Sequence, residues 1–171
     1  MKEAVGGTWL FGIVITFIVF FTTYISMSTN YAKSFKVKDE ILMAIEHYKG
    51  VNDKSVARIS DYVTKLGFYS TGKCSDNSGE ISASMKNYSG WLGFDHSGTG
   101  VSNASNATYC IRKALISDEK HGPIGHPPAA YYQVVVFFKL DWPVFNTIFN
   151  VRVEGETSII HKYRDTYVFT T

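Results

Sequence analysis

The feature that most constrains the fold of this chain is an uncharged run near its N-terminus. No charged side chain occurs from Ala4 to Ala32, and almost every residue from Trp9 to Met27 is apolar or carries a hydroxyl group. At a rise of about 1.5 Å per residue, roughly 20 helical residues cross a hydrocarbon core of about 30 Å. The run therefore predicts a membrane-crossing helix.

A cleaved secretory signal fits this run less well. Such signals have a positively charged head, an apolar core of about 7–15 residues and a cleavage site made of small residues. Here the head is MKEAVGG, the apolar core is longer, and SMSTNYAKSFKVKDE follows it. We therefore expect no cleavage after the helix.

The helix is predicted to continue beyond the membrane, because residues 31–50 contain no proline and a single glycine, Gly50. Apolar residues recur at helical spacing as Phe35, Ile41, Leu42, Ile45 and Tyr48. Charged residues are available for a wet face as Lys36, Lys38, Asp39, Glu46 and Lys49. Gly50 is expected to supply the left-handed C-terminal cap. The pattern indicates one helix of about forty residues, apolar in its first half and amphipathic in its second.

The rest of the chain, 51–171, reads as one small α+β domain. Residues 51–67 predict a short amphipathic helix with Asn52 or Asp53 as N-cap and Gly67 as terminator. Its apolar stripe consists of Val56, Ile59, Val63 and Leu66. The Ser-, Gly- and Asn-rich stretch 68–108 predicts long surface loops with at most one short strand pair.

The last third is rich in β-branched and aromatic residues at period two, in TYCIRKALIS, YYQVVVFFKLDW and NVRVEGETSII. One face of the last strand is expected to carry Val151, Val153, Thr157 and Ile159, and the other Arg152, Glu154, Glu156 and Ser158. This alternation predicts an antiparallel sheet with one dry and one wet side. The connector PVFNTIF, led by Pro143, is expected to form a helical turn or a loop over the sheet.

Two cysteines, Cys74 and Cys110, lack the nearby Cys or His partners of a structural zinc site. In an oxidising compartment they would form a disulfide, which the chain-entropy model values at about 4 kcal/mol. Two buried free thiols are the other interpretation. The expected fold is thus a long N-terminal helix, 1–50, packed on a small antiparallel sheet with a loop region held by a disulfide.

No arrangement of residues indicates catalysis. His121 and His126, with His96 or Asp118, come nearest to a metal site, but they lack ligand spacing. Asp95, His96 and Ser97 are adjacent, so their side chains do not easily converge as a triad. We expect no catalytic, cofactor-binding or metal-binding residue, and so no enzyme. The net charge of +2, without a basic run among aromatics, also excludes nucleic acid as the expected partner.

The orientation of the helix is predicted from two opposing signals. Lys33, Lys36 and Lys38 follow the apolar run, which by the positive-inside rule favours a cytoplasmic C-terminus. The expected disulfide and the polar loop region favour the opposite side of the membrane, because disulfides persist in oxidising compartments. We expect the C-terminal domain to be extracytoplasmic.

A short head before GGTWLFGIVITFIVFF, an uninterrupted helix into YAKSFKVKDEILMAIEHY, and the ending YYQVVVFFKLDWPVFNTIFNVRVEGETSII occur together. In this combination the chain resembles the TadE/TadG-like pseudopilins, pilin-like proteins of the tight-adherence (Tad) branch of type IV filament machines. The resemblance covers both ends and not the middle, 68–130. Processing would fall at Gly6 or Gly7. Pilin-type precursors usually place a glutamate five residues later, where this chain has Phe11 or Gly12.

The resemblance implies a structural subunit, a major or minor pseudopilin, that waits in lipid and then assembles with itself or with other pilin-like subunits through its helix. The assembly residues would be Trp9, Leu10, Phe11, Ile13, Val14, Ile15, Phe17, Ile18, Val19, Phe20 and Phe21. Its location would be the cell membrane as a single-pass protein, then a surface filament. The alternative is a membrane-anchored extracytoplasmic binding or sensing domain that does not polymerise.

Overall fold

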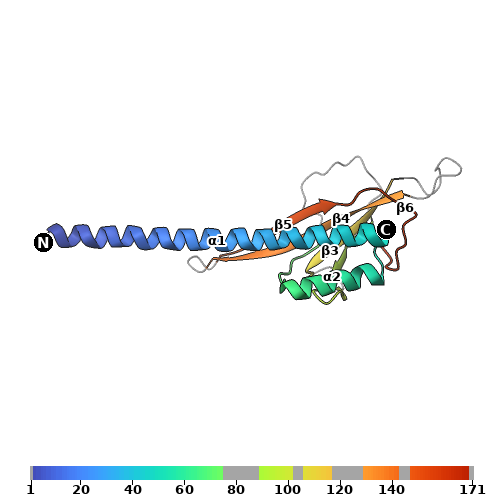
Figure 1. Cartoon of the computed structure of the whole chain (residues 1–171), viewed down its shortest axis with the longest axis horizontal. Helices are drawn as coiled ribbons and strands as arrows, with labels where there is room; N and C mark the ends of the chain where they lie inside the picture. The colour runs from blue at the N-terminus through green and yellow to red at the C-terminus, as the bar shows by residue number, and fades with distance from the viewer. Residues whose placement is uncertain (1, 75–88, 102–105, 117–128, 143–146, 170–171) are drawn as a thin grey trace.

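The computed structural model describes residues 2–74, 89–101, 106–116, 129–142 and 147–169, with the backbone alone for residues 2–6, 140–142 and 147–150. Helix α1, Lys2–Tyr48, runs the length of the molecule, and its second half lies with helix α2, Asp53–Leu66, against one sheet (Figure 1). The N-terminal part of α1 extends beyond every other described element (Figure 1). The α+β class and the long helix predicted from the sequence are confirmed.

The sheet is antiparallel, in the order β2-β1-β3-β4-β5, and β6 pairs with the start of β4. Its strands are β1 Leu92–Phe94, β2 Gly100–Val101, β3 Tyr109–Leu115, β4 Ala129–Trp142, β5 Thr147–Glu156 and β6 Ile160–His161. Strand β4 is the longest and lies between β3 and β5. The short strand pair expected within the loop region is β1 with β2.

One face of the sheet forms the main core together with the two helices. From α1 the buried apolar residues are Val37, Ile41, Ala44 and Ile45, and from α2 they are Val56, Ile59 and Val63. They pack against Tyr109, Ile111, Tyr132, Val134, Val136, Phe138 and Val153 of the sheet. Phe35 was predicted to belong to the α1 stripe, and this is wrong, because it lies six residues before Ile41 and is 38% exposed. Val37, four residues before Ile41, is buried in its place.

The other face of the sheet carries a smaller core around a disulfide. Cys74 is bonded to Cys110 of β3, and the two pack with Val135 and Phe137 of β4 and with Ala107. The predicted disulfide is therefore confirmed. The prediction of one dry and one wet side is wrong for β4, since every residue from Tyr132 to Phe138 is buried. The disulfide-linked segment covers the face that the sequence pattern left open to water.

The ends of the helices follow their local sequence. Asn52 caps α2 by accepting a hydrogen bond from the Ser55 amide, and Gly67 ends it in the left-handed region at φ 65°. At the end of α1 the left-handed residue is Lys49 (φ 56°), and Gly50 follows at φ 136°. The prediction of Gly50 as that cap is wrong by one residue. Gly50 is required there instead because the C-terminal tail crosses it: a Cβ on Gly50 would lie 2.6 Å from Asp165 Oδ1.

Strand β5 differs from its prediction at both ends. Thr147, Ile148 and Phe149 belong to the strand and form no helical turn, while residues 143–146 lie outside the described residues. At the other end Gln133 pairs with Glu156, and Ala130 pairs with Ile160. Between these two pairs β4 advances by three residues, whereas the opposite chain advances by four. One extra residue is a β-bulge, which reverses the side that each later residue faces. Ile159, predicted to be buried, is therefore 56% exposed, and Ile160 is buried.

Candidate functional site

The first candidate surface is the uncovered half of α1. The eleven residues predicted for membrane insertion and assembly, from Trp9 to Phe21, are all exposed, between 37% for Val19 and 73% for Trp9. This helix is long and apolar enough to cross a membrane, and no part of its apolar window is buried. A core helix of a soluble protein would be covered by its own fold. The surface therefore requires lipid or other polypeptide to cover it.

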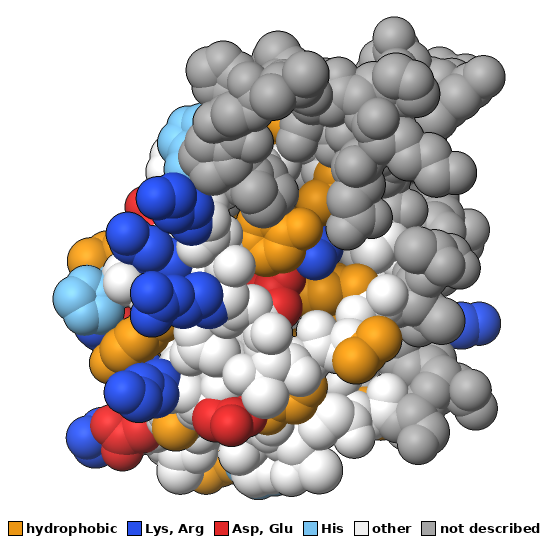
Figure 2. Space-filling view, turned by 90° about the vertical axis from the view of Figure 1, so that its right-hand side faces the viewer, with side chains coloured by type: hydrophobic (Ala, Val, Ile, Leu, Met, Phe, Trp, Pro, Cys, Tyr) orange, Lys and Arg blue, Asp and Glu red, His pale blue; other side chains and the backbone are white. Residues whose placement is uncertain are grey.

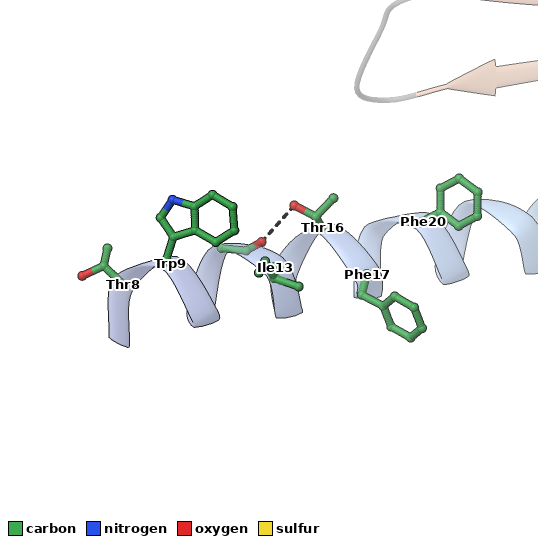
Figure 3. Close-up of a pocket in the computed structure, with 7 residues that line it drawn as sticks. Thr8, Trp9, Ile13, Thr16, Phe17 and Phe20 are labelled. Carbon is green, nitrogen blue, oxygen red and sulfur yellow. Dashed lines mark hydrogen bonds between the residues drawn. The ribbon is translucent and has the colours of Figure 1, made fainter. Parts of the chain in front are cut away.

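Four threonine hydroxyls on this half of α1 are satisfied within the helix. The hydroxyl groups of Thr16, Thr22, Thr23 and Thr29 each donate to a carbonyl three or four residues earlier, at 2.9–3.0 Å. Figure 3 shows the bond from Thr16 Oγ1 to the carbonyl oxygen of Gly12. Such back-bonding removes the need for water, which a hydrocarbon environment does not offer. The threonines are thus compatible with lipid.

Gly12 lies in a shallow hollow on the same helix, lined by Thr8, Trp9, Ile13, Thr16, Phe17 and Phe20 (Figure 3). A Cβ on Gly12 would meet no atom within 4 Å. The hollow belongs to a single helix and has no opposite wall, so it is a notch in a contact surface and not an enclosed ligand pocket. Gly6 and Gly7 lie in the same helix, α1, and processing at either residue stays a prediction.

The second candidate surface is at the distal end, the end of the molecule opposite the N-terminus of α1. A groove there, which we call the distal groove, is lined by His47, Tyr48, Lys49, Asn52, Asp53, Lys54, Arg164, Asp165 and Thr166. Lys49, Lys54 and Arg164 are exposed. Figure 2 views this end and shows Lys and Arg side chains gathered on one side of it. The groove thus presents positive charge.

The floor of the distal groove is a clasp between the C-terminal tail and the two helices. Arg164 and Thr166 donate backbone hydrogen bonds to the carbonyls of Lys49 and Val51 at 2.7 and 3.0 Å. The carboxylate of Asp165 accepts from the Val51 amide at 2.9 Å and from Lys113 Nζ at 3.0 Å. The side chains of Lys113 and Asp165 are only 15% and 8% exposed. Asp165 is therefore committed to the fold, and among the exposed charged residues of the groove the three basic ones outnumber the single acid, Asp53.

Tyr132 of β4 donates its hydroxyl to Asp165 Oδ1 at 2.7 Å. Burial raises the pKa of Tyr132 far above that of a free tyrosine, and the hydrogen bond to Asp165 and the charge of that carboxylate raise it further. The phenol is thus neutral at any physiological pH. It serves as a donor that positions the tail and not as a proton-transfer group.

The residues weighed for chemistry do not assemble into a site. Asp95 Oδ1 accepts from Ser97 N, Ser97 Oγ and Thr99 N at 2.7–2.9 Å, which closes a local turn. Burial raises the pKa of Asp95, but these hydrogen bonds outweigh it and hold the pKa below the usual value. His96 instead packs edge-on against Tyr69. Within the described parts of the chain no group of three or more His, Cys, Asp or Glu is placed to hold a metal, and His121, His126 and Asp118 lie outside them.

The tail residues are the part of the site that sequence reasoning missed. Asp165, Arg164 and Thr166 lie in a stretch with no period-two or helical pattern, so no local signal assigns them a position. Only the mixture of charged and aromatic residues from His161 to Phe169 hints at a packed tail. Comparison of the chain with protein-family models, with curated proteins and with solved structures gives no match.

Proposed function

We propose that this chain is a pilin-like structural subunit of a Tad or type IV-like surface filament or secretion apparatus, assembled through the uncovered half of α1. The observation that carries the proposal is the division of one unbroken helix. Residues 7–31 expose their apolar side chains, whereas Val37, Ile41 and Ile45 are part of the domain core. A subunit built this way transmits the position of its helix rigidly to its domain.

The continuity of α1 supports a retained anchor over a removed signal. Tyr31 and Phe35 follow the apolar run directly, their rings 5.2 Å apart, and Tyr31 also contacts Phe138 of β4 at 5.9 Å. The end of the apolar run is thus already attached to the folded domain, with no extended small-residue segment of the kind that signal cleavage uses.

The apolar surface of α1 also fits two successive environments. Lipid chains and the helices of other copies are about equally apolar, so transfer from one to the other changes little apolar exposure. Association is then governed by side-chain packing, for which the Gly12 notch allows close approach. This explains how one helix serves first as membrane anchor and later as assembly element.

The disulfide supports an extracytoplasmic position for the domain. Cys74 and Cys110 join segments 36 residues apart across one face of the sheet. Disulfides of this kind form and persist outside the reducing cytoplasm. On this basis residues 51–171 lie outside the cytoplasmic membrane and α1 enters it as a single span.

The alternative function is a membrane-anchored binding domain that does not polymerise. The distal groove favours it, because Lys49, Lys54 and Arg164 gather on the surface farthest from the membrane. Both functions need the anchor, and only the filament subunit needs contact between copies.

Amine crosslinking in intact cells separates the two functions. A filament subunit gives a ladder of multimers, whereas a solitary anchor gives the monomer. The variant Phe17→Ala/Phe20→Ala keeps α1 apolar, and so membrane-bound, but removes two exposed rings, and we expect it to shorten the ladder. Tyr69→Ala removes an equally exposed ring (59%) from the domain and is the matched control, with an unchanged ladder expected. Monomer alone from the unmodified chain would refute the filament proposal.

A further inference from the structure

Strands β4 and β5 extend past the rest of the sheet as a two-stranded ribbon beside α1. Strand β3 pairs with β4 only as far as Val136, whereas β5 pairs with it through to Trp142. Figure 1 shows this ribbon running along α1 toward the N-terminus. Beyond Phe138 the ribbon therefore lies outside the core of the domain.

Two contacts fix the level of the ribbon along α1. A Cβ on Gly155, which pairs with Val134, would lie 2.8 Å from Lys38 Cδ. Four residues further along β4, the ring of Phe138 lies 5.9 Å from that of Tyr31. Progress along β4 thus corresponds to progress along α1 toward the apolar run.

Along the axis of α1, the end of the ribbon reaches the level of the apolar run and does not stop short of it. Trp142 is four residues beyond Phe138, which at about 3.3 Å per residue is a further 13 Å or so. The same distance along a helix, at about 1.5 Å per residue, covers about nine residues. Counted from Tyr31, this places the pair Trp142 and Thr147 at about the level of Thr22, within the run that ends at Met27.

The composition of the ribbon changes at this point. Lys139 is exposed and lies within hydrogen-bond distance of Thr71 Oγ1, at 3.4 Å. Of the six strand residues that follow it and face each other in register, four are apolar: Leu140, Trp142, Ile148 and Phe149. We call Leu140–Trp142 with Thr147–Phe149 the ribbon end. Tryptophan is enriched at membrane interfaces, where an amphipathic ring meets both lipid and water.

We propose that the ribbon end enters the outer headgroup and acyl boundary of the membrane that α1 crosses, as a second membrane contact. The inference rests on the membrane embedding of α1 proposed above. Thr22 lies five residues inside the end of the apolar run, which is a depth of about 8 Å. Apolar faces of interfacial elements are buried by a similar amount, about 5–10 Å.

Two features limit the ribbon end to this depth. A two-stranded ribbon has open edges, whose backbone groups need water and are not tolerated in the hydrocarbon centre. Asp141 carries a charge, which the headgroup region accepts at much lower cost. A domain held at two points, the helix and the ribbon end, has its tilt over the membrane fixed before assembly.

Tryptophan fluorescence of the full-length protein in phosphatidylcholine vesicles tests the inference, because the chain has three tryptophans in different places. Conservative changes to phenylalanine leave one at a time: Trp9→Phe/Trp91→Phe reports Trp142, Trp91→Phe/Trp142→Phe reports Trp9, and Trp9→Phe/Trp142→Phe reports Trp91. Lipids with spin labels at shallow or deep positions on the acyl chain quench tryptophans at their own depth. A low ratio of protein to lipid keeps neighbouring copies from shielding Trp142.

The expected result is loss of Trp142 emission with the shallow label, less loss with the deep label, and no loss for Trp91, which lies under Arg112 in the domain. Quenching of Trp9 without quenching of Trp142 would overturn the ribbon inference while leaving the anchor intact. Trp142 quenched most by the deep label would also overturn it. If neither Trp9 nor Trp142 is quenched, the membrane anchor itself is wrong, and the proposed function fails with it.

Discussion

Asp165 accepts a 2.7 Å hydrogen bond from the hydroxyl of Tyr132, a residue 33 positions earlier in the chain. The same carboxylate pairs with Lys113 of β3 and receives the Val51 amide, so it joins the tail to the sheet and to the turn between the helices. The turn that follows α1, the sheet and the tail therefore meet at one buried carboxylate. Disruption of this clasp should loosen the attachment of α1 to the domain.

Replacement of this carboxylate should be strongly destabilising. Asp165→Ala leaves Lys113 buried without its partner, and loss of one member of a buried ion pair costs about 3–5 kcal/mol. Urea unfolding of the full chain in detergent, followed by near-ultraviolet circular dichroism, measures the change. Asp61→Ala is the matched control, because the pair of Asp61 with Lys65 is exposed and its loss should leave the unfolding midpoint in place. Equal midpoints for both variants would show that the clasp is not structural.

Substitution of Gly50 should have a similar effect through the backbone. Gly50→Ala places a Cβ 2.6 Å from Asp165 Oδ1 at a residue whose φ of 136° disfavours a side chain. We expect a lower melting temperature than for Gly100→Ala, where a Cβ would meet nothing within 4 Å. If Gly50→Ala melts no lower than Gly100→Ala, the tail does not pack on the turn as described.

Alkaline pH should unfold the domain by way of its buried tyrosines. Burial raises the pKa of Tyr109 and of Tyr132, so in the folded protein both remain protonated where an unfolded tyrosine, with a pKa of about 10, ionises. Their contribution to stability is complete below pH 10 and is lost as the pH rises above it. Tyrosinate absorbance recorded with circular dichroism checks this: the last tyrosines should ionise only as the fold is lost. Complete ionisation of all tyrosines while the fold persists would contradict it.

The disulfide should contribute substantially to the stability of the domain. Opening the link between Cys74 and Cys110 releases a loop of 36 residues, worth about 4 kcal/mol in the chain-entropy model. Cys74→Ala/Cys110→Ala should therefore unfold at a lower urea concentration than the oxidised chain. The unmodified chain in reductant is the control, and it should match the variant. Equal stability of the oxidised chain and the variant would show that the smaller core holds without the link.

Local patterns in the sequence predicted the elements of this fold well. The apolar run, the Asn52 cap and the Gly67 terminator are set by residues close in sequence, and the structure confirms each. Features set by distant residues were missed. Glycine is required at position 50 because Asp165 packs against it, and not because the helix ends there. Ile160 is buried only because of the bulge that precedes it. The second face of β4 is buried because the segment that carries Cys74 covers it.

The same limit applies to the candidate sites. The exposed apolar half of α1 can be predicted without tertiary information, because it stays exposed among the described residues. The distal groove depends on the tail returning to the end of α1, and the level of the ribbon end depends on the contact between Phe138 and Tyr31. These relationships have no signature in the local sequence.

The most direct test of assembly is a cysteine scan along α1. Single cysteines at successive positions from Trp9 to Phe21 leave the native pair in its disulfide, so each new thiol forms only links between copies. Oxidation of the full-length protein in native membranes should give crosslinked dimers that rise and fall with the period of about 3.6 residues of a packed helix face. Met43→Cys, an exposed position in the second half of the helix, is the control for random collision. Yields along the apolar half that never exceed those at position 43 would show that lipid alone covers the helix, and the account of this chain as an assembling subunit would be wrong.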